Sequence, residues 1–88
     1  MSCTVKQAFN LIKENLSNPL FHIIDVRSLG EYQTGHIKGS QLIPLGDLGQ
    51  RIKEFDKAGT YLMVCRSGAR SGSATFTLNS QGFKAINM

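Results

Sequence analysis

The sequence predicts an α/β domain, in which strands alternate with helices along the chain. Two short apolar runs, Phe21 to Val26 and Tyr61 to Val64, have the pattern of strands that are buried on both faces. Segments with helical signals stand before, between and after these runs. Strands and helices in this order are typical of a parallel sheet whose strands are joined by right-handed crossovers.

The opening part of the chain holds the first helix and the first strong strand. Thr4 and Gln7 have the spacing of a capping box, and apolar residues recur at helical spacing as far as Leu16. We therefore expect an amphipathic helix from Thr4 to about Leu16. The apolar run from Phe21 to Val26 is the strand that follows, and the carboxylate of Asp25 lies near its end.

The middle of the chain carries weaker signals. Residues 27–41 are polar and rich in turn-forming residues, so we expect turns there. Residues 42–43 form a brief predicted strand before Pro44 interrupts the pairing. Asp47 is the expected cap of a second helix, which has apolar residues on one face and runs to Phe55.

The last third of the chain repeats the alternation. The strand from Tyr61 to Val64 is followed by a predicted helix from Arg70 to Gln81. Ser, Thr and Gly are poor helix formers, so packing on the sheet has to hold this helix. Gly82 is the expected left-handed terminator, and a final strand is predicted from Phe83 to Met88.

Size and composition indicate one small globular domain over residues 1–88, with 41% hydrophobic and 18% charged residues. No apolar stretch approaches the roughly 20 residues that span a bilayer, so we expect a soluble, cytoplasmic protein with no membrane partner. The net charge of +4 favours anionic ligands. Because the lysines are scattered and Trp is absent, no nucleic-acid partner is expected.

Cys65 is the candidate nucleophile. The buried strand that ends at Val64 delivers it to the carboxyl edge of the sheet, where open α/β folds bind ligands. Gly68 permits a tight loop whose N–H groups turn inward, and the following helix directs its positive end at the same place. With Arg66 and Arg70 nearby, these features favour the thiolate over the neutral thiol.

The other cysteine, Cys3, has no such surroundings. Two cysteines are too few for a disulfide framework in a chain this short, so we expect Cys65 to be reduced and reactive. Cys3 lies at the amino end, where it is expected to be incidental. The alternative is that it acts as a resolving thiol.

Several short stretches match those of a known family in order and in separation. They are Ile23 to Arg27, Glu31-Tyr32, Gly35 to Ser40, Ile43 to Leu45, Val64 to Ser71 and Gly82-Phe83. With these stretches the chain resembles a single-domain rhodanese, a sulfurtransferase domain, over nearly its whole length.

The resemblance implies a small three-layer α/β domain with a mostly parallel five-stranded sheet flanked by helices. Only three residues precede the predicted first helix, so the family's first strand is missing here or reduced to an edge stub.

The resemblance also implies the chemistry. Cys65 resembles the family's cysteine that cycles between thiol and persulfide, with no metal and no organic cofactor. The expected partners are a small anionic sulfur donor such as thiosulfate and a thiophilic acceptor such as cyanide or a thiol. The residues expected to hold the donor and the extra sulfur are Arg66, Ser67, Gly68, Ala69 and Arg70.

Further matched residues have structural interpretations. Asp25 and Arg27 fall at the carboxyl end of a strand, where we expect them to brace loops in a supporting role, with Glu31 as a candidate partner. His36 lies between glycines in a loop, and sulfur transfer from a pre-formed thiolate needs no general base. It is therefore left out of the catalytic set.

Two other functions remain open at this point. A phosphatase or arsenate reductase of the same fold would place five residues between the cysteine and the arginine, whereas four separate Cys65 from Arg70, and position 71 is Ser. The shorter loop fits a sulfur atom better than a phosphate. The second alternative, a persulfide carrier or regulatory module with a protein partner, would keep the same cysteine.

Overall fold

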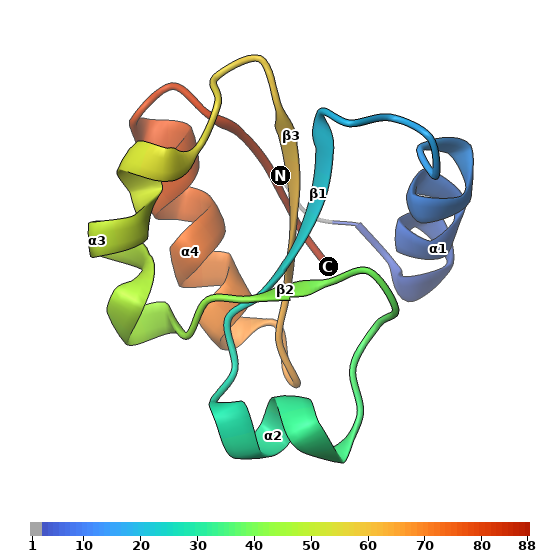
Figure 1. Ribbon diagram of the computed structural model, residues 1–88, viewed down its shortest axis with the longest axis horizontal. Coiled ribbons are helices and arrows are strands. Elements are labelled where there is room, and N and C mark those ends of the chain that lie inside the picture. Colours follow the sequence, from blue (N-terminus) through green and yellow to red (C-terminus); the bar gives the residue numbers. More distant parts are fainter. Residues whose placement is uncertain (1–2) are drawn as a thin grey trace.

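The centre of the molecule is a parallel sheet, seen in the computed structural model, which describes residues 3–88 (Figure 1). Its strand order is β2-β1-β3-β4. The central strands are β1 (Phe21–Asp25) and β3 (Thr60–Val64), and the edges are β2 (Gln41–Leu42) and β4 (Lys84–Asn87). Every neighbouring pair is parallel, so all carboxyl ends meet at one edge of the sheet.

The sheet has four strands within residues 3–88, where the family resemblance implies five. Before the first helix, the chain makes one backbone hydrogen bond at the outer edge of β4, from the Cys3 N–H to the Asn87 carbonyl at 2.8 Å. Thr4 is already the cap of that helix, so Cys3 is the one described residue that bonds to this edge. The predicted first strand is thus an edge stub in the described part of the chain. Met1 and Ser2 lie outside it.

Helices cover both faces of the sheet and one of its ends (Figure 1). α1 (Val5–Glu14) lies on one face, and α3 (Leu48–Arg51) and α4 (Ala69–Ser80) lie on the other. α2 (Leu29–Thr34) lies beyond the carboxyl ends of β1 and β3. This is the three-layer α/β arrangement that the family resemblance implies, with an extra helix at the edge where ligands bind in such folds.

Alternating side chains of the central strands build a core on each face, as expected for strands buried on both sides. Ile23 and Leu62 face α1, and their neighbours Ile24 and Met63 face the opposite way. The core on the side of α3 and α4 consists of Ile24, Val26, Ile43, Leu48, Tyr61, Met63, Ala74, Leu78 and Ala85. Together these two layers fix the register that carries Cys65 to the carboxyl edge.

Several predicted element ends are confirmed. The capping box of α1 is present, with the Gln7 N–H donating to Thr4 Oγ1 at 3.1 Å and the Thr4 N–H donating to Gln7 Oε1 at 2.8 Å. α4 begins at Ala69, one residue before the expected start, and Gly82 has the left-handed φ of 89° that ends the helical region.

The predicted helix from Asp47 to Phe55 was wrong in detail. The segment consists of two 3₁₀ turns, Leu45–Asp47 and Ile52–Glu54, on either side of the single turn of α3. Asp47 itself has helical angles, φ −97° and ψ −10°, and makes no side-chain capping bond. N-cap residues typically have extended backbone angles, and Asp47 instead ends the preceding 3₁₀ turn.

The stretch after β1, expected to form turns, contains α2. Ser28 caps this helix: its hydroxyl accepts from the Glu31 N–H at 3.3 Å, and Glu31 Oε1 accepts from the Ser28 N–H at 3.1 Å. The spacing Ser28-x-x-Glu31 is the sequence signal of this capping box. Glu31 also accepts two hydrogen bonds from Arg70, at 2.7 and 2.8 Å, and so ties α2 to the start of α4.

We predict that Glu31→Gln lowers the free energy of unfolding at pH 7. Hydrogen bonds from Arg70, and then from the Ser28 backbone, hold the pKa of Glu31 well below its usual range. A carboxyl with a lowered folded pKa contributes stability above its ordinary pKa of about 4.3, and this contribution is lost as the pH falls toward the folded value. Glutamine keeps the capping bond and loses the charge.

Urea denaturation at pH 7 and at pH 3 measures the effect. The difference between wild type and Glu31→Gln is expected to be larger at pH 7. Glu14→Gln, at an exposed position of α1, is the matched control and should leave the free energy of unfolding unchanged. An equal difference at both pH values would contradict the ion-pair argument.

Candidate functional site

Cys65 is the first residue after β3, at the carboxyl edge of the sheet. Its partly buried side chain packs against the core on the side of α3 and α4, the face to which Tyr61 and Met63 also point. The period of two along the strand therefore places the thiol beside the start of α4. The predicted strand-to-helix junction is confirmed.

Two main-chain N–H groups and one hydroxyl group surround the Cys65 sulfur. The Gly68 N–H lies 3.0 Å from Sγ and the Ser71 N–H lies 3.3 Å from it. The hydroxyl oxygen of Ser71 lies 3.2 Å from Sγ. Donors aimed at one atom in this way favour a negative charge on that atom.

The sulfur stands where a capping side chain normally stands. Gly68 is the residue before α4, has a left-handed φ of 86°, and has no side chain that could cap the helix. Cys65 Sγ instead accepts from the main chain of the first helical turn, at Ser71. The free N–H groups and the dipole of a twelve-residue helix therefore point at the sulfur.

These contacts make the thiol more acidic. Burial acts to raise the pKa of Cys65, but the side chain of Ser71 and the N–H groups of Ser71, Gly68 and Ser67 outweigh burial, so the pKa of the thiol is lowered. Arg70 is also attracted to the charged sulfur, although the main cause of its own raised pKa is the hydrogen bond with Glu31. The sequence predicts a more acidic thiol and the contribution of the loop N–H groups, but it does not predict the contribution of Ser71.

Two residues at the site were not predicted as functional. Ser71 is fully buried, and its hydroxyl donates a hydrogen bond to Asn87 Oδ1 at the end of β4. Asn87 Nδ2 donates to the Gly68 carbonyl at 3.3 Å. Ser71 could have been found from its place in the first turn after the loop. Asn87 has no local signal, because the pairing of β3 with β4 brings it to the site.

The two arginines of the loop differ in their surroundings. Arg66 is exposed and forms no ion pair with any residue between 3 and 88. Arg70 forms the bidentate pair with Glu31 on α2. The remaining loop residues, Ser67 and Ala69, are exposed, and the Ala69 N–H approaches Ser67 Oγ at 3.5 Å.

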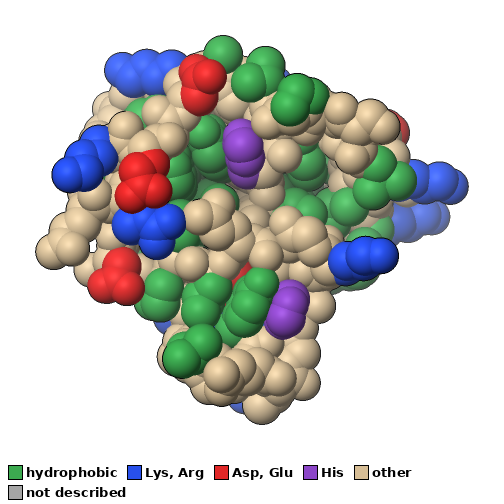
Figure 2. Space-filling model, in the orientation of Figure 1, with side chains coloured by type: hydrophobic (Ala, Val, Ile, Leu, Met, Phe, Trp, Pro, Cys, Tyr) green, Lys and Arg blue, Asp and Glu red, His purple; other side chains and the backbone are tan. Residues whose placement is uncertain are grey.

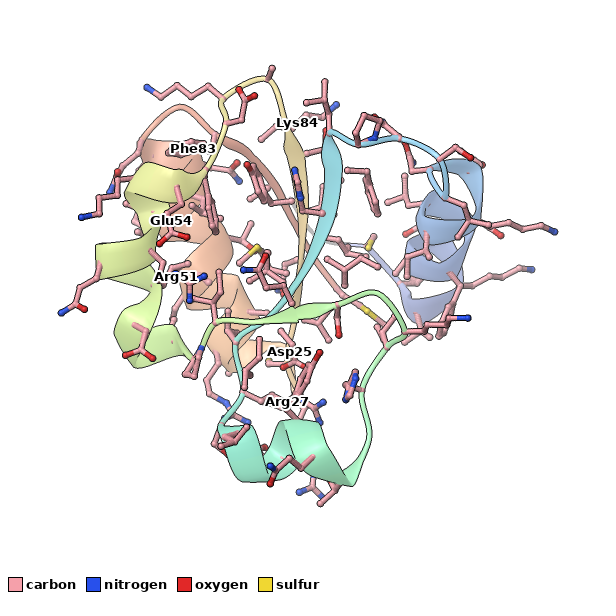
Figure 3. The ribbon with its side chains drawn as sticks, viewed as in Figure 1. Asp25, Arg27, Arg51, Glu54, Phe83 and Lys84 are labelled. Atoms are coloured by element: carbon pink, nitrogen blue, oxygen red, sulfur yellow. The ribbon has the colours of Figure 1, made fainter. Side chains whose placement is uncertain are left out.

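Asp25 and Arg27 bind each other at the end of β1. Arg27 Nη2 lies 2.7 Å from Asp25 Oδ2, and Arg27 Nε lies 2.9 Å from Asp25 Oδ1. The same guanidinium donates to the Gly35 carbonyl at 2.7 Å, just after α2. Figure 3 shows both side chains between the end of β1 and α2. Asp25 is fully buried, and the pair links the strand to the chain beyond α2.

The histidines and Cys3 lie in other contacts. His36 stacks on Tyr32 with ring centroids 3.7 Å apart, and its Nδ1 lies 2.8 Å from the Tyr32 carbonyl. His22 stacks on Tyr61 at 4.8 Å. Cys3 packs in the core on the α1 side of the sheet, whereas Cys65 packs on the opposite side, and burial raises the pKa of the Cys3 thiol.

Away from the Cys65 loop, the features to consider in the described residues are metal sites, membrane spans and pockets. Between residues 3 and 88, no three His, Cys, Asp or Glu side chains come together as metal ligands, and no helix there is long and apolar enough to cross a membrane. A hollow of about 650 Å³ lies between α1 and residues 36–39, and none of its lining residues belongs to the Cys65 loop. On the face in Figure 2, lysines and arginines are scattered around the rim.

Comparison with known proteins adds independent information. The sequence pattern of the family described as "Rhodanese-like domain" matches residues 8–88. The crystal structure of a rhodanese-like domain protein from Staphylococcus aureus is similar over 99% of this chain and 82% of its own, with a TM-score of 0.85 and 30% identity.

Two curated relatives extend the comparison. Thiosulfate sulfurtransferase PspE of Escherichia coli (strain K12) is 38% identical over 75 residues, which cover 80% of this chain and 72% of PspE. YrkF of Bacillus subtilis (strain 168), provisionally named a sulfur carrier protein, is 39% identical over 70 residues, which cover 80% of this chain. The chain spans only 38% of the length of YrkF. From the matched sequence pattern, the shared fold and these relatives, the chain belongs to the rhodanese-like domain family.

Proposed function

We propose that this protein is a sulfurtransferase, which moves a sulfane sulfur from an anionic donor such as thiosulfate to a thiophilic acceptor such as cyanide or a thiol. Cys65 carries the sulfur between the two as a persulfide. The observation that supports this most directly is the convergence of the Gly68 N–H, the Ser71 N–H and the Ser71 hydroxyl on Cys65 Sγ. The name of PspE, a thiosulfate sulfurtransferase, agrees with this class of reaction.

The reaction has two half-reactions, each with one bond formed and one broken. The Cys65 thiolate attacks the outer sulfur of thiosulfate, an S–S bond forms, and sulfite leaves with the electron pair of the broken bond. In the second half-reaction the acceptor attacks the outer sulfur of the persulfide. The S–S bond then breaks and the Cys65 thiolate is restored. No redox partner is needed, and we propose no metal or cofactor.

The loop residues hold the transferred sulfur and its donor. In this proposal the N–H groups of residues 66–70 surround the outer sulfur. Arg66, which is exposed, binds the anionic end of the donor. Arg70 adds positive charge at the base of the loop while it remains paired with Glu31. Asp25 and Arg27 brace the neighbouring edge of the sheet.

The chemistry also bears on the compartment. The reaction needs Cys65 as a free thiol, and a reducing compartment keeps thiols free. We therefore propose that the transfer takes place in the cytoplasm.

Intact mass after thiosulfate treatment tests the proposal. The wild-type protein is expected to gain one sulfur atom and to lose it when cyanide is added, because the persulfide forms on Cys65 and cyanide removes its outer sulfur. Cys65→Ser should keep its fold and gain nothing, whereas Cys3→Ser, the matched control, should gain the sulfur as wild type does. A protein without the adduct that releases phosphate from an aryl phosphate would support the phosphatase alternative instead.

Gly68→Ala tests whether the loop conformation contributes to the reaction. An alanine at a φ of 86° costs about 1–2 kcal/mol, although there is room for the methyl group. We expect the loop to relax and to move the Gly68 N–H away from sulfur, which slows persulfide formation by about tenfold.

The rate of sulfur gain after mixing with thiosulfate measures this effect. Gly30→Ala is the control, because Gly30 has an ordinary φ and open space around its α-carbon. A folded Gly68→Ala protein that gains sulfur at the wild-type rate would count against the role of the loop.

The second candidate function is a persulfide carrier with a protein partner, favoured by the similarity to YrkF. Steady-state kinetics distinguish the two. An enzyme with small substrates is expected to turn over thiosulfate and cyanide repeatedly. A carrier is expected to accept one sulfur and then to stop until the partner protein is added. The ping-pong pattern of initial rates belongs to the first outcome only.

A further inference from the structure

The buried hydroxyl of Ser71 lies between two acceptors. Its oxygen lies 3.2 Å from Cys65 Sγ, and it is hydrogen-bonded to Asn87 Oδ1. A serine hydroxyl has one proton and two lone pairs. Ser71 can therefore donate to the sulfur or to Asn87, but not to both.

The Asn87 side chain is held in the orientation that makes it an acceptor. Its Nδ2 donates to the Gly68 carbonyl at 3.3 Å, so Oδ1 is the atom that faces Ser71. The main chain of Asn87 is held in β4, where Asn87 pairs with Met63 of β3.

We propose that the Ser71 hydroxyl is a two-position switch, which donates to Asn87 while the Cys65 sulfur is uncharged and donates to the sulfur when it is negatively charged. In the uncharged state the thiol proton points to Ser71 Oγ and the Ser71 proton points to Asn87 Oδ1. When the thiol proton leaves to solvent, the hydroxyl turns to the thiolate, because a charged acceptor forms the stronger hydrogen bond. Asn87 is thus a positioning residue that competes with the sulfur for one proton.

The role of this switch in catalysis rests on the proposed function. The charge on Sγ disappears when the persulfide forms, because Sγ is then bonded to the outer sulfur. It returns when the acceptor breaks that bond. The hydroxyl would follow the charge, releasing Sγ after the first half-reaction and stabilising it as the leaving group of the second.

Charged groups near the sulfur are the same in both positions of the hydroxyl. Arg70, at the start of α4, interacts with the charged sulfur and is paired with Glu31 of α2. Arg66 in the loop is exposed, and Asp25 at the end of β1 is paired with Arg27. On β4, the side chain that contacts the Ser71 hydroxyl is the uncharged amide of Asn87. None of these charges needs to change for the hydroxyl to turn.

A double-mutant cycle on the ionisation of Cys65 tests the switch. The four proteins carry Ser71 or Ser71→Ala together with Asn87 or Asn87→Ala, all in a Cys3→Ser background so that one thiol reports. The rate of alkylation by iodoacetamide across pH gives the ionisation constant of Cys65 in each. Any effect of Asn87 through its bond to Gly68 is common to both Ser71 backgrounds and cancels in the cycle.

Asn87→Ala should increase the ionisation constant of Cys65. We expect this increase to be about five times larger with Ser71 present than with Ser71→Ala. This factor corresponds to the loss on ionisation of one hydrogen bond worth about 1 kcal/mol. The decisive ratio compares the effect of Asn87→Ala on the ionisation constant with Ser71 present and with Ser71 absent. A ratio of two or less, which includes any ratio below one, would overturn the switch. Far-UV circular dichroism checks the fold, and Asn87→Leu, of similar size and without the amide, provides a second cycle.

The measurement uses no sulfur donor. It can therefore fail while thiosulfate still loads Cys65, which would leave the proposed function in place. It can also succeed in a protein that forms no persulfide.

Discussion

The hydrogen bonds between the Cys65 sulfur and the first turn of α4 serve structure and chemistry together. A helix begins with main-chain N–H groups that have no partner within it, and here a sulfur atom accepts from two of these groups, at Gly68 and Ser71. The residue in the capping place, Gly68, supplies the left-handed turn and no side chain. Because α4 is rich in weak helix formers, its start depends on this sulfur as well as on packing against β3 and β4.

Around the sulfur, most of the nearby charge is already balanced. Asp25 is neutralised by Arg27, and Glu31 binds Arg70 through both carboxylate oxygens. These pairs connect β1, α2 and α4 at the carboxyl edge, so they hold the walls of the site in place. Arg66 is the loop cation without an ion-pair partner in residues 3–88. An anionic donor would therefore meet neutral N–H donors and one exposed guanidinium, rather than a field of several free charges.

The sequence predicted what depends on neighbouring residues. Three features can be recognised from residues only a few positions apart: the buried apolar runs, the capping box at Thr4 and the loop after Val64. The structure confirms them. The short helix α2 was missed because Gly30 and polar neighbours outweighed the capping signal of Ser28 and Glu31. The ion pair of Glu31 with Arg70 spans 39 positions, and the Ser71 contact with Asn87 spans 16. Such contacts follow from strand order and register, which single-sequence patterns do not specify.

The use of sulfur as a helix cap links the dynamics of α4 to the chemical state of Cys65. A persulfide carries its charge on the outer sulfur, one bond farther from the N–H of Ser71 than the thiolate charge is. If Cys65 is loaded in this way, the first turn of α4 loses part of its cap and opens more often, while the central strands stay closed. The rate of amide hydrogen exchange at the start of α4 would then rise when Cys65 is loaded and fall when the sulfur is delivered. This rate would therefore report whether the site carries a sulfur.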